Sequence, residues 1–234
     1  MNIAIIGYGK MGHIIEKIAL ARGINVKAKI DPFAKDATHK EISKESLNGI
    51  DACIEFTTPD TAIENIKKIA ALKKNIVVGT TGWYDKIEEA KRAVKENNIG
   101  LIYSPNFSIG VNIFFRLIKD ISGMMSNFGD YKVSITEAHH IHKKDAPSGT
   151  AKKIAEIIKE NIKKISNINI KSIREGEIPG THTVNFESNA DIIKLEHEAK
   201  NREGFALGAV MAAEWIKGKK GFFTIEDMMK EIIK

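Results

Sequence analysis

Long apolar segments are missing from this chain of 234 residues, in which no run of eighteen apolar residues occurs. The N-terminus also lacks a basic leader followed by an apolar stretch and a cleavage site, because it enters a strand-like run at once. The sequence therefore predicts no membrane association, and we expect a cytoplasmic protein.

Cysteine is almost absent. Cys53 is the single cysteine, and it lies in the strand-like run Asp51–Phe56. One cysteine can form no internal disulfide, so the position predicts a small buried side chain in reducing surroundings.

Aromatic residues make up only 7% of the chain, and the sequence contains no zinc-finger spacing, no RNA-binding aromatic string and no compact basic block. The net charge of +6 comes mostly from lysines scattered along helical segments, which is typical of solvated helix faces. We therefore expect no nucleic-acid partner. Positive charge of this kind suits small anionic ligands.

What the chain does have is alternation of strands and helices. Apolar runs at Ala52–Phe56, Asn75–Val78 and Ile99–Tyr103 are separated by helical patterns that begin at Asp60 and Asp85. This order predicts a Rossmann-type, doubly wound parallel sheet in an α/β fold, with ligands at the carboxyl ends of the strands. A hydrophobic content of 43% is enough for two modest cores.

The first strand, Asn2–Ile6, leads into a glycine-rich turn and then into a helical pattern over His13–Ala21. G-x-G-x-x-G spacing permits a tight turn, close approach of the backbone to a pyrophosphate, and packing of the helix on the strand. The residues of this candidate cofactor loop are Gly7, Tyr8, Gly9, Lys10, Met11 and Gly12.

Asp31 ends the second strand, Val26–Ile30, nineteen residues beyond Gly12. A carboxylate that binds the adenosine ribose belongs at this position. The alternative interpretation is a turn residue before Pro32.

The later part of the chain predicts a smaller α+β region. A helix over Asn112–Met125 precedes a strand that ends at His139, and turn-rich flanks favour an antiparallel pair. The strands of that pair are Thr181–Phe186 and Ile192–Glu198, and two further helices are expected over Phe205–Trp215 and from Ile225 toward Ile233.

Glu137–Ala151 is the most unusual stretch, because it packs three histidines, two lysines and two acids around Pro147 and Gly149. A helix begins after it, with Ser148 as the expected N-cap, so its free N–H groups can bind a carboxylate or phosphate. A metal site and a structural polar loop remain alternatives. Metal is the weaker one, since no cysteine or second ligand cluster accompanies the histidines.

The same stretch resembles the motif of 4-hydroxy-tetrahydrodipicolinate reductases (dihydrodipicolinate reductases). Glu-Ala-His-His, a further His, a Lys and then Asp-Ala-Pro-Ser-Gly-Thr-Ala occur here in the family's order and spacing. The resemblance continues from Ile3 nearly to the C-terminus. It implies NAD(P)H-dependent reduction of 4-hydroxy-tetrahydrodipicolinate, a dicarboxylate, to tetrahydrodipicolinate in lysine and diaminopimelate biosynthesis. Two alternatives are an NAD(P)-dependent amino-acid dehydrogenase acting on another imine or oxo acid, and a nucleotide-sensing regulator without turnover.

The resemblance also implies roles for individual residues. His139 is the expected general acid, because imidazole titrates near neutral pH, and Lys143 is the second proton-donating or charge-stabilising group. His140, Gly149 and Thr150 are expected to bind the substrate. His142 has no assigned role beyond structure, and no metal is expected. The residues implied to border the nicotinamide are Gly79, Thr80, Thr81, Ser104, Pro105, Asn106 and Phe107.

For the cofactor, Asp31 predicts a preference for NADH, with NADPH also used. The glycine loop is one residue shorter than in many members of the family, and Lys10 stands where an Arg is usual. The expected organisation is a dinucleotide-binding domain over 1–107, a substrate-binding and oligomerisation domain over 108–208, and C-terminal helices over 209–234 that return to the first domain. The resemblance implies a homotetramer formed by the second domain.

Overall fold

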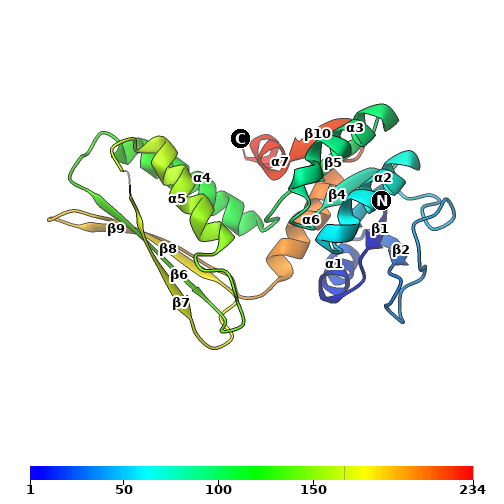
Figure 1. Ribbon diagram of the computed structural model, residues 1–234, viewed down its shortest axis with the longest axis horizontal. Coiled ribbons are helices and arrows are strands. Elements are labelled where there is room, and N and C mark those ends of the chain that lie inside the picture. Colours follow the sequence, from blue (N-terminus) through cyan, green and yellow to red (C-terminus); the bar gives the residue numbers. More distant parts are fainter. Residues whose placement is uncertain (166, 234) are drawn as a thin grey trace. The chain divides into compact units, whose positions relative to one another are not determined.

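The computed structural model describes residues 1–165 and 167–233. The chain forms two compact units, Met1–Ile109 with Glu203–Lys234, and Gly110–Arg202 (Figure 1). The first unit is therefore built from both ends of the chain, and the second is one continuous segment.

A six-stranded parallel sheet forms the first unit. Its strands are β1 (Asn2–Ile6), β2 (Asn25–Ile30), β3 (Ala52–Glu55), β4 (Asn75–Val78), β5 (Gly100–Tyr103) and β10 (Gly221–Thr224). Their order is β10-β5-β4-β3-β1-β2, and every neighbouring pair is parallel. The order reverses at β1, with β2 on one side and β3 on the other. The predicted Rossmann-type fold is confirmed, with β10 as a strand that the sequence analysis missed.

Helices cover both faces of this sheet because its strands alternate between two cores. Ile3 and Ile5 of β1 pack with residues of α1 (Lys10–Ala21), α6 (Glu203–Trp215) and α7 (Ile225–Ile232). Ala4 and Ile6 point the other way, toward α2 (Pro59–Ala71) and α3 (Ile87–Asn97), which follows the short 3-10 helix η1 (Tyr84–Lys86). Cys53 of β3 is fully buried in the second of these cores, as predicted.

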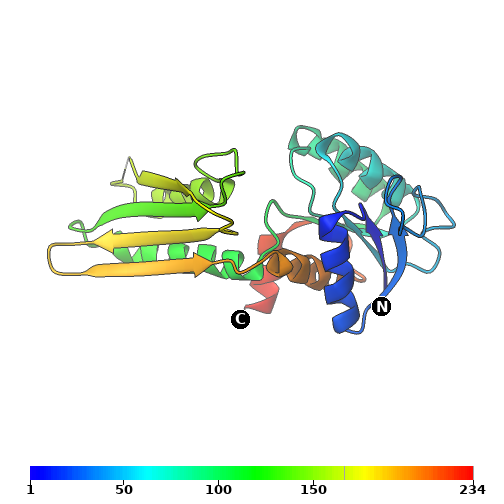
Figure 2. The ribbon, with the colours of Figure 1, turned by 90° about the horizontal axis from the view of Figure 1, so that it is seen from below.

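The second unit is a mixed sheet with helices on one face. Its elements are α4 (Ile109–Met125), β6 (Lys132–His139), α5 (Gly149–Asn161), β7 (Asn169–Arg174), β8 (Thr181–Glu187) and β9 (Ile192–Glu198). The strand order is β7-β6-β8-β9, in which β6 and β7 are parallel and the other pairs antiparallel (Figure 2). The predicted pair β8–β9 is confirmed, and β7 is a strand that the sequence analysis missed.

The core of this unit lies between the sheet and its two helices. Ile135 of β6 and Phe186 of β8 pack with Ile118 of α4 and Ile158 of α5. The opposite face of the sheet carries mainly polar side chains, such as Thr183, and no helix among the described residues of the unit covers it (Figure 1). The sheet therefore presents one apolar and one polar face, the usual pattern for antiparallel strands.

The boundary between the units differs from the one expected at 208, because α6 is one helix that belongs to the first unit from Glu203 onward. Ala206 and Ala209 are fully buried in the first unit's core. A Cβ added to Gly208 would collide with the carbonyl oxygen of Phe107, so the helix and the end of the β5 segment are in direct contact. The N-terminal part of the first unit ends at Ile109.

Among the described residues, no helix combines the length and apolar character needed to cross a membrane.

Candidate active site

The glycine loop that follows β1 needs its glycines for different physical reasons. Gly7 has φ +89, and a Cβ there would collide with the carbonyl oxygen of Phe56. A Cβ on Gly12 would lie 2.6 Å from the carbonyl oxygen of Gly7, so this glycine lets α1 pack against the turn. Gly9 is the N-cap of α1 and has open space around it. A phosphate can therefore approach the first N–H groups of α1, next to Lys10 and Met11.

Asp31 lies beside this loop. Its carboxylate accepts hydrogen bonds from the backbone N–H groups of Tyr8 (2.9 Å), Phe33 (2.8 Å) and Ala34 (2.9 Å). Burial raises the pKa of Asp31, but these N–H groups outweigh burial, so the pKa lies below its ordinary value. A carboxylate has about four acceptor positions, so a charged Asp31 keeps capacity for a ribose hydroxyl.

The side chain of Tyr8 points into the protein and not into the loop. It is only 2% exposed, stacks on His13 with ring centroids 4.2 Å apart, and hydrogen-bonds Glu16. Lys10 is exposed, whereas Met11 is partly buried against the core. Among these predicted cofactor residues, Tyr8 and Met11 can therefore offer only backbone groups.

The residues predicted to border the nicotinamide follow β4 and β5 at the same sheet edge as the glycine loop. Thr80 is buried, and its Oγ1 accepts a hydrogen bond from the N–H of Thr57 (2.7 Å). Thr81 is exposed. A Cβ on Gly79 would collide with the ring of Phe56, so any larger residue there would have to displace that ring.

The loop after β5 is held by Ser104. Its hydroxyl accepts from the N–H of Asn106 (3.0 Å) and donates to the carbonyl oxygen of the same residue (2.8 Å). Pro105 is exposed, while Phe107 is 2% exposed and belongs to the first unit's core. The loop thus has a fixed shape, and Phe107 supports it from inside.

In the second unit, His139 lies at the end of β6 with Glu137 two residues before it on the same face. Nδ1 of His139 hydrogen-bonds a carboxylate oxygen of Glu137. The other oxygen accepts from Nη2 of Arg174 (2.8 Å) and from the N–H of Ser148 (3.3 Å). Arg174 reaches Glu137 because β7 pairs with β6 in parallel, and this register places Arg174 opposite His139.

The charge of Glu137 decides which nitrogen of His139 is reactive. Burial raises the pKa of Glu137, but hydrogen bonds from Arg174, Ser172 and His139 outweigh it, so the pKa is lowered and the carboxylate is charged. A charged carboxylate only accepts hydrogen bonds, so Nδ1 carries a proton and Nε2 is the nitrogen that can take up and release one. Burial lowers the pKa of His139, and the charge of Glu137 acts in the opposite direction.

A second buried imidazole, His182 of β8, packs against His139. The ring centroids are 5.1 Å apart at 75°, and Nε2 of His182 hydrogen-bonds Oγ of Ser148 (3.2 Å). Ser148 also accepts from the N–H of Ala151 (3.2 Å), which confirms the predicted N-cap of α5. Burial, followed by the charge of His139, lowers the pKa of His182 to about 4, so this ring is neutral at pH 7.

Glu137, His139 and His182 also resemble a metal site, since one ligand atom from each lies within 4.8 Å of the others. The guanidinium of Arg174 already contacts Glu137 and is only 19% exposed. A cation placed between the three side chains would face this fixed positive charge at short range. The arrangement therefore fits proton transfer better than metal binding.

Lys143 lies four residues after His139, in the loop that leads to α5. Its Nζ contacts Oδ1 of Asp145 at 2.7 Å. The loop is fastened to β7 by Arg174, which donates to the carbonyl oxygens of Lys143 (3.3 Å) and Asp145 (2.5 Å). Arg174 thus connects the carboxylate that holds His139 to the loop that carries Lys143.

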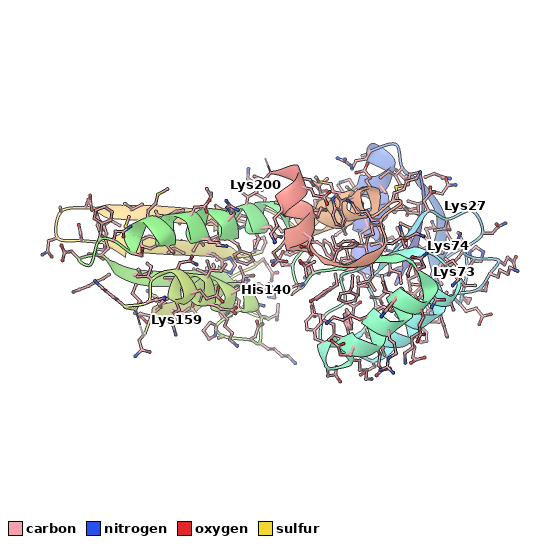
Figure 3. The ribbon with its side chains drawn as sticks, turned by 90° about the horizontal axis from the view of Figure 1, so that it is seen from above. Lys27, Lys73, Lys74, His140, Lys159 and Lys200 are labelled. Carbon is pink, nitrogen blue, oxygen red and sulfur yellow. The ribbon has the colours of Figure 1, made fainter. Side chains whose placement is uncertain are left out.

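His140 and His142 differ in their surroundings. The N–H of His140 donates to the carbonyl oxygen of Ile178 (2.8 Å), and its Nδ1 is buried with no hydrogen-bond partner among the described residues. Figure 3 labels His140, which directly follows β6. His142 is largely exposed, with Glu177 at 4.0 Å. Buried polar atoms without a hydrogen-bond partner are found at functional sites, so this difference favours His140 over His142 as a site residue.

Three residues of this site, Glu137, Arg174 and His182, have no role predicted from the sequence. Glu137 and His182 lie on expected strands, and each shares its strand face with buried apolar residues such as Ile135 and Val184, which was the available signal. Arg174 lies on the strand that was missed, so nothing in the sequence placed it beside Glu137.

Comparison with known proteins gave consistent results. Residues 1–107 match the family model of the dihydrodipicolinate reductase N-terminus, and residues 110–229 match that of its C-terminus. A 4-hydroxy-tetrahydrodipicolinate reductase of Christiangramia forsetii is 42% identical over 246 residues, covering 100% of both chains. The enzyme of that name from Archaeoglobus fulgidus is 36% identical and covers 98% of this chain and 100% of its own.

The fold also matches solved structures. The dipicolinate-bound dihydrodipicolinate reductase from Paenisporosarcina sp. TG-14 aligns with a TM-score of 0.79 at 23% identity, covering 97% of this chain and 99% of that one. A probable dehydrogenase from Thermotoga maritima aligns with a TM-score of 0.65 at 12% identity, covering 97% and 92%. At such identities the likeness concerns the fold.

Proposed function

The chain belongs to the dihydrodipicolinate reductase family, and we propose that the Glu137–Ala151 stretch is its catalytic centre. It is an NAD(P)H-dependent oxidoreductase that reduces 4-hydroxy-tetrahydrodipicolinate to tetrahydrodipicolinate in lysine and diaminopimelate biosynthesis. The resemblance inferred from the sequence is confirmed. Family membership over the whole chain sets aside the amino-acid dehydrogenase and the regulator. The cytoplasmic location stays a prediction.

One relationship carries the assignment of His139 as the general acid. Its Nδ1 is held by a buried carboxylate, so its Nε2 exchanges the proton. The net reaction replaces the 4-hydroxyl of the substrate by hydrogen: bound NAD(P)H would supply one hydride, one proton would be taken up, and the hydroxyl would leave as water. Imidazolium at His139 is the proposed donor of that proton, and Glu137 stabilises the charged ring. Lys143 supplies positive charge or a second proton in the same loop.

The substrate is a dicarboxylate, so the site needs donors for two carboxylates. Lys143, His140 and the N-terminus of α5 at Gly149 and Thr150 are the proposed partners. Gly149 supports this because nothing lies within 4 Å of a Cβ built on it, so there is space for a ligand beside the first residue of the helix. A helix N-terminus also favours negative charge through its dipole.

The test is oxidation of NADH on addition of freshly made substrate, followed at 340 nm, with wild type, His139→Gln and His142→Gln. His139→Gln should lower kcat by roughly a hundred- to ten-thousand-fold, the usual worth of a positioned acid. NADH affinity should stay near that of wild type. His142→Gln is the matched control, since this exposed histidine should lose little activity. Near-normal turnover of His139→Gln would show that His139 is not the general acid.

The proposed cofactor preference rests on Asp31. Its charged carboxylate can bind the ribose of NADH and repels the 2′-phosphate of NADPH. Pro32 and Phe33 follow it, so no arginine clamp for a phosphate stands directly beside it. We propose that NADH is preferred about tenfold, which equals about 1.4 kcal/mol, with NADPH still used.

The proposed homotetramer involves the second unit. Its sheet has a helix-free, mainly polar face, which is available for contact with strands of another copy. Light scattering at working concentration should give four times the chain mass of 26.0 kDa. A monomer would contradict this assembly.

A further inference from the structure

Asp145 pairs with a lysine that was proposed above to bind the substrate. Its Oδ1 lies 2.7 Å from Nζ of Lys143. The ammonium of Lys143 is one of the groups proposed for a carboxylate of the substrate. In the free chain this ammonium therefore already holds a carboxylate of the chain itself.

We propose that Asp145 is an internal mimic of the substrate carboxylate, which keeps the anion site filled in the free enzyme and is displaced when substrate binds. This inference rests on the proposed function of Lys143. Asp145 would then set how tightly carboxylates bind, since only a ligand that replaces its contacts can enter.

The structure allows the side chain to move while the backbone stays fixed. The carbonyl oxygen of Asp145 accepts from Nη2 of Arg174 at 2.5 Å, and Arg174 is anchored on Glu137. The side chain of Asp145 is 52% exposed, whereas that of Lys143 is only 24% exposed. Rotation of Asp145 toward solvent therefore frees Lys143 without breaking the contacts that hold the loop.

Charge explains why displacement, and not joint binding, is expected. A substrate dianion beside an ionised Asp145 would place three negative charges near Lys143, and Arg174 is already paired with Glu137. Like charges at short distance in a partly buried site repel strongly. The contacts of Asp145 also lower its pKa, so the side chain is charged at neutral pH and cannot escape repulsion by taking up a proton.

Competition of this kind has a function in the reaction cycle. An unpaired lysine near a helix N-terminus would bind any small anion, including phosphate from the medium. With Asp145 in place, a single carboxylate gains little, because it replaces one carboxylate by another. A dicarboxylate gains the additional contacts of its second group, so it still binds at concentrations at which a single carboxylate does not.

Calorimetric titration of the full-length protein with dipicolinate, the ligand of the structurally similar reductase, tests this inference. Asp145→Asn keeps the size of the side chain but removes its charge. It should tighten binding of dipicolinate and of a monocarboxylate such as picolinate by a similar factor of about three to ten, because each ligand must displace the same side chain. Asp130→Asn is the matched control, because it removes an exposed carboxylate of the same unit and should change neither affinity.

The double variant Lys143→Ala with Asp145→Asn makes the test specific. Without the lysine, removal of the Asp145 charge should have little further effect, since there is no ammonium to release. Unchanged or weaker dipicolinate binding by Asp145→Asn would contradict the proposal that Asp145 mimics the substrate carboxylate. Asp145 would then be a residue that positions Lys143. Failure of the wild-type protein to bind dipicolinate at all would instead contradict the proposed function of the site.

Discussion

A Cβ built on Gly180 lies 3.1 Å from Nε2 of His139, the nitrogen that we propose exchanges the catalytic proton. Gly180 also has φ +149, a backbone conformation that side chains rarely adopt. The glycine thus keeps space beside the reactive nitrogen. This position combines a conformational and a steric requirement, which makes a substitution there informative.

Gly180→Ala should lower kcat at least tenfold, because the new methyl group crowds Nε2 of His139 and displaces the ring. Strain should also reduce stability by about 1–3 kcal/mol. Gly176→Ala is the control: Gly176 also has positive φ (+49), but nothing lies within 4 Å of a Cβ built there. Steady-state kinetics and thermal unfolding of both variants separate the two effects. Equal losses of activity would show that strain alone is responsible.

Glu137→Gln should shift the pH dependence of kcat/KM to lower pH. His139 must be protonated to act as an acid, so activity falls as pH rises through its pKa. The charge of Glu137 raises that pKa, and removing it leaves burial and the neighbouring cations Lys143 and Arg174, which all lower it. A shift of about one pH unit or more is expected. Glu175→Gln, an exposed neighbour, should not move the profile. If the pH profile of Glu137→Gln is unshifted, the charge of Glu137 does not raise the pKa of the group that acts as the acid.

Asp31→Ser should move cofactor preference toward NADPH, because it removes the charge that opposes the 2′-phosphate. The ratio of kcat/KM for NADH to that for NADPH should fall from about ten to one or below. Asp36→Ser, an exposed acid of the same loop, serves as the control for a change in net charge. A wild-type enzyme with a strong NADPH preference, or an unchanged ratio in Asp31→Ser, would contradict ribose binding by Asp31.

Glu55→Gln should stabilise the first unit at neutral pH. Glu55 is fully buried at the end of β3, and its Oε2 has no hydrogen-bond partner among the described residues. Burial raises its pKa despite hydrogen bonds from Thr57, Thr80 and Asn65. The folded state therefore favours the neutral form of Glu55. This preference stabilises the fold below the unfolded-state pKa of 4.5, and the stabilisation is lost as the pH rises through the higher pKa of the folded state.

Glutamine is neutral throughout, so the variant should gain on the order of 1 kcal/mol over wild type at pH 8, and the gain should disappear near pH 4.5. Thermal unfolding at the two pH values measures it. Glu45→Gln, which changes an exposed acid of the same unit, should show no such trend. If the difference in stability between Glu55→Gln and wild type is the same at both pH values, Glu55 has the same pKa in the folded and unfolded states.

The sequence predicted those features that depend on short-range patterns. The glycine loop, the strand that ends at His139 and the N-cap at Ser148 all follow from neighbours a few residues apart. Strand β7 was missed because Ile170 and Ile173 are three residues apart, which is not the alternation of a strand. It forms because β6 provides a parallel partner.

The same limit applies to the site. Pairing of Arg174 with Glu137 joins residues 37 apart in sequence, and the contact between His182 and Ser148 joins residues 34 apart. Strand register brings Arg174 to Glu137, and register depends on which face of each strand is buried, whereas the contact of His182 depends on where α5 begins. Residue types could therefore indicate the acid and the lysine, but not the side chains that orient them.

The position of β10 has a consequence for biosynthesis. This strand forms the edge of the first unit next to β5, yet its residues, Gly221–Thr224, are synthesised after the whole of the second unit, Gly110–Arg202. All residues of the second unit are made earlier, because that unit is continuous. The nascent chain can thus complete its inserted unit while the first unit still exposes the β5 edge and the apolar surface later covered by α6. Premature termination before Glu203 should yield a chain with one intact unit and an aggregation-prone partial sheet.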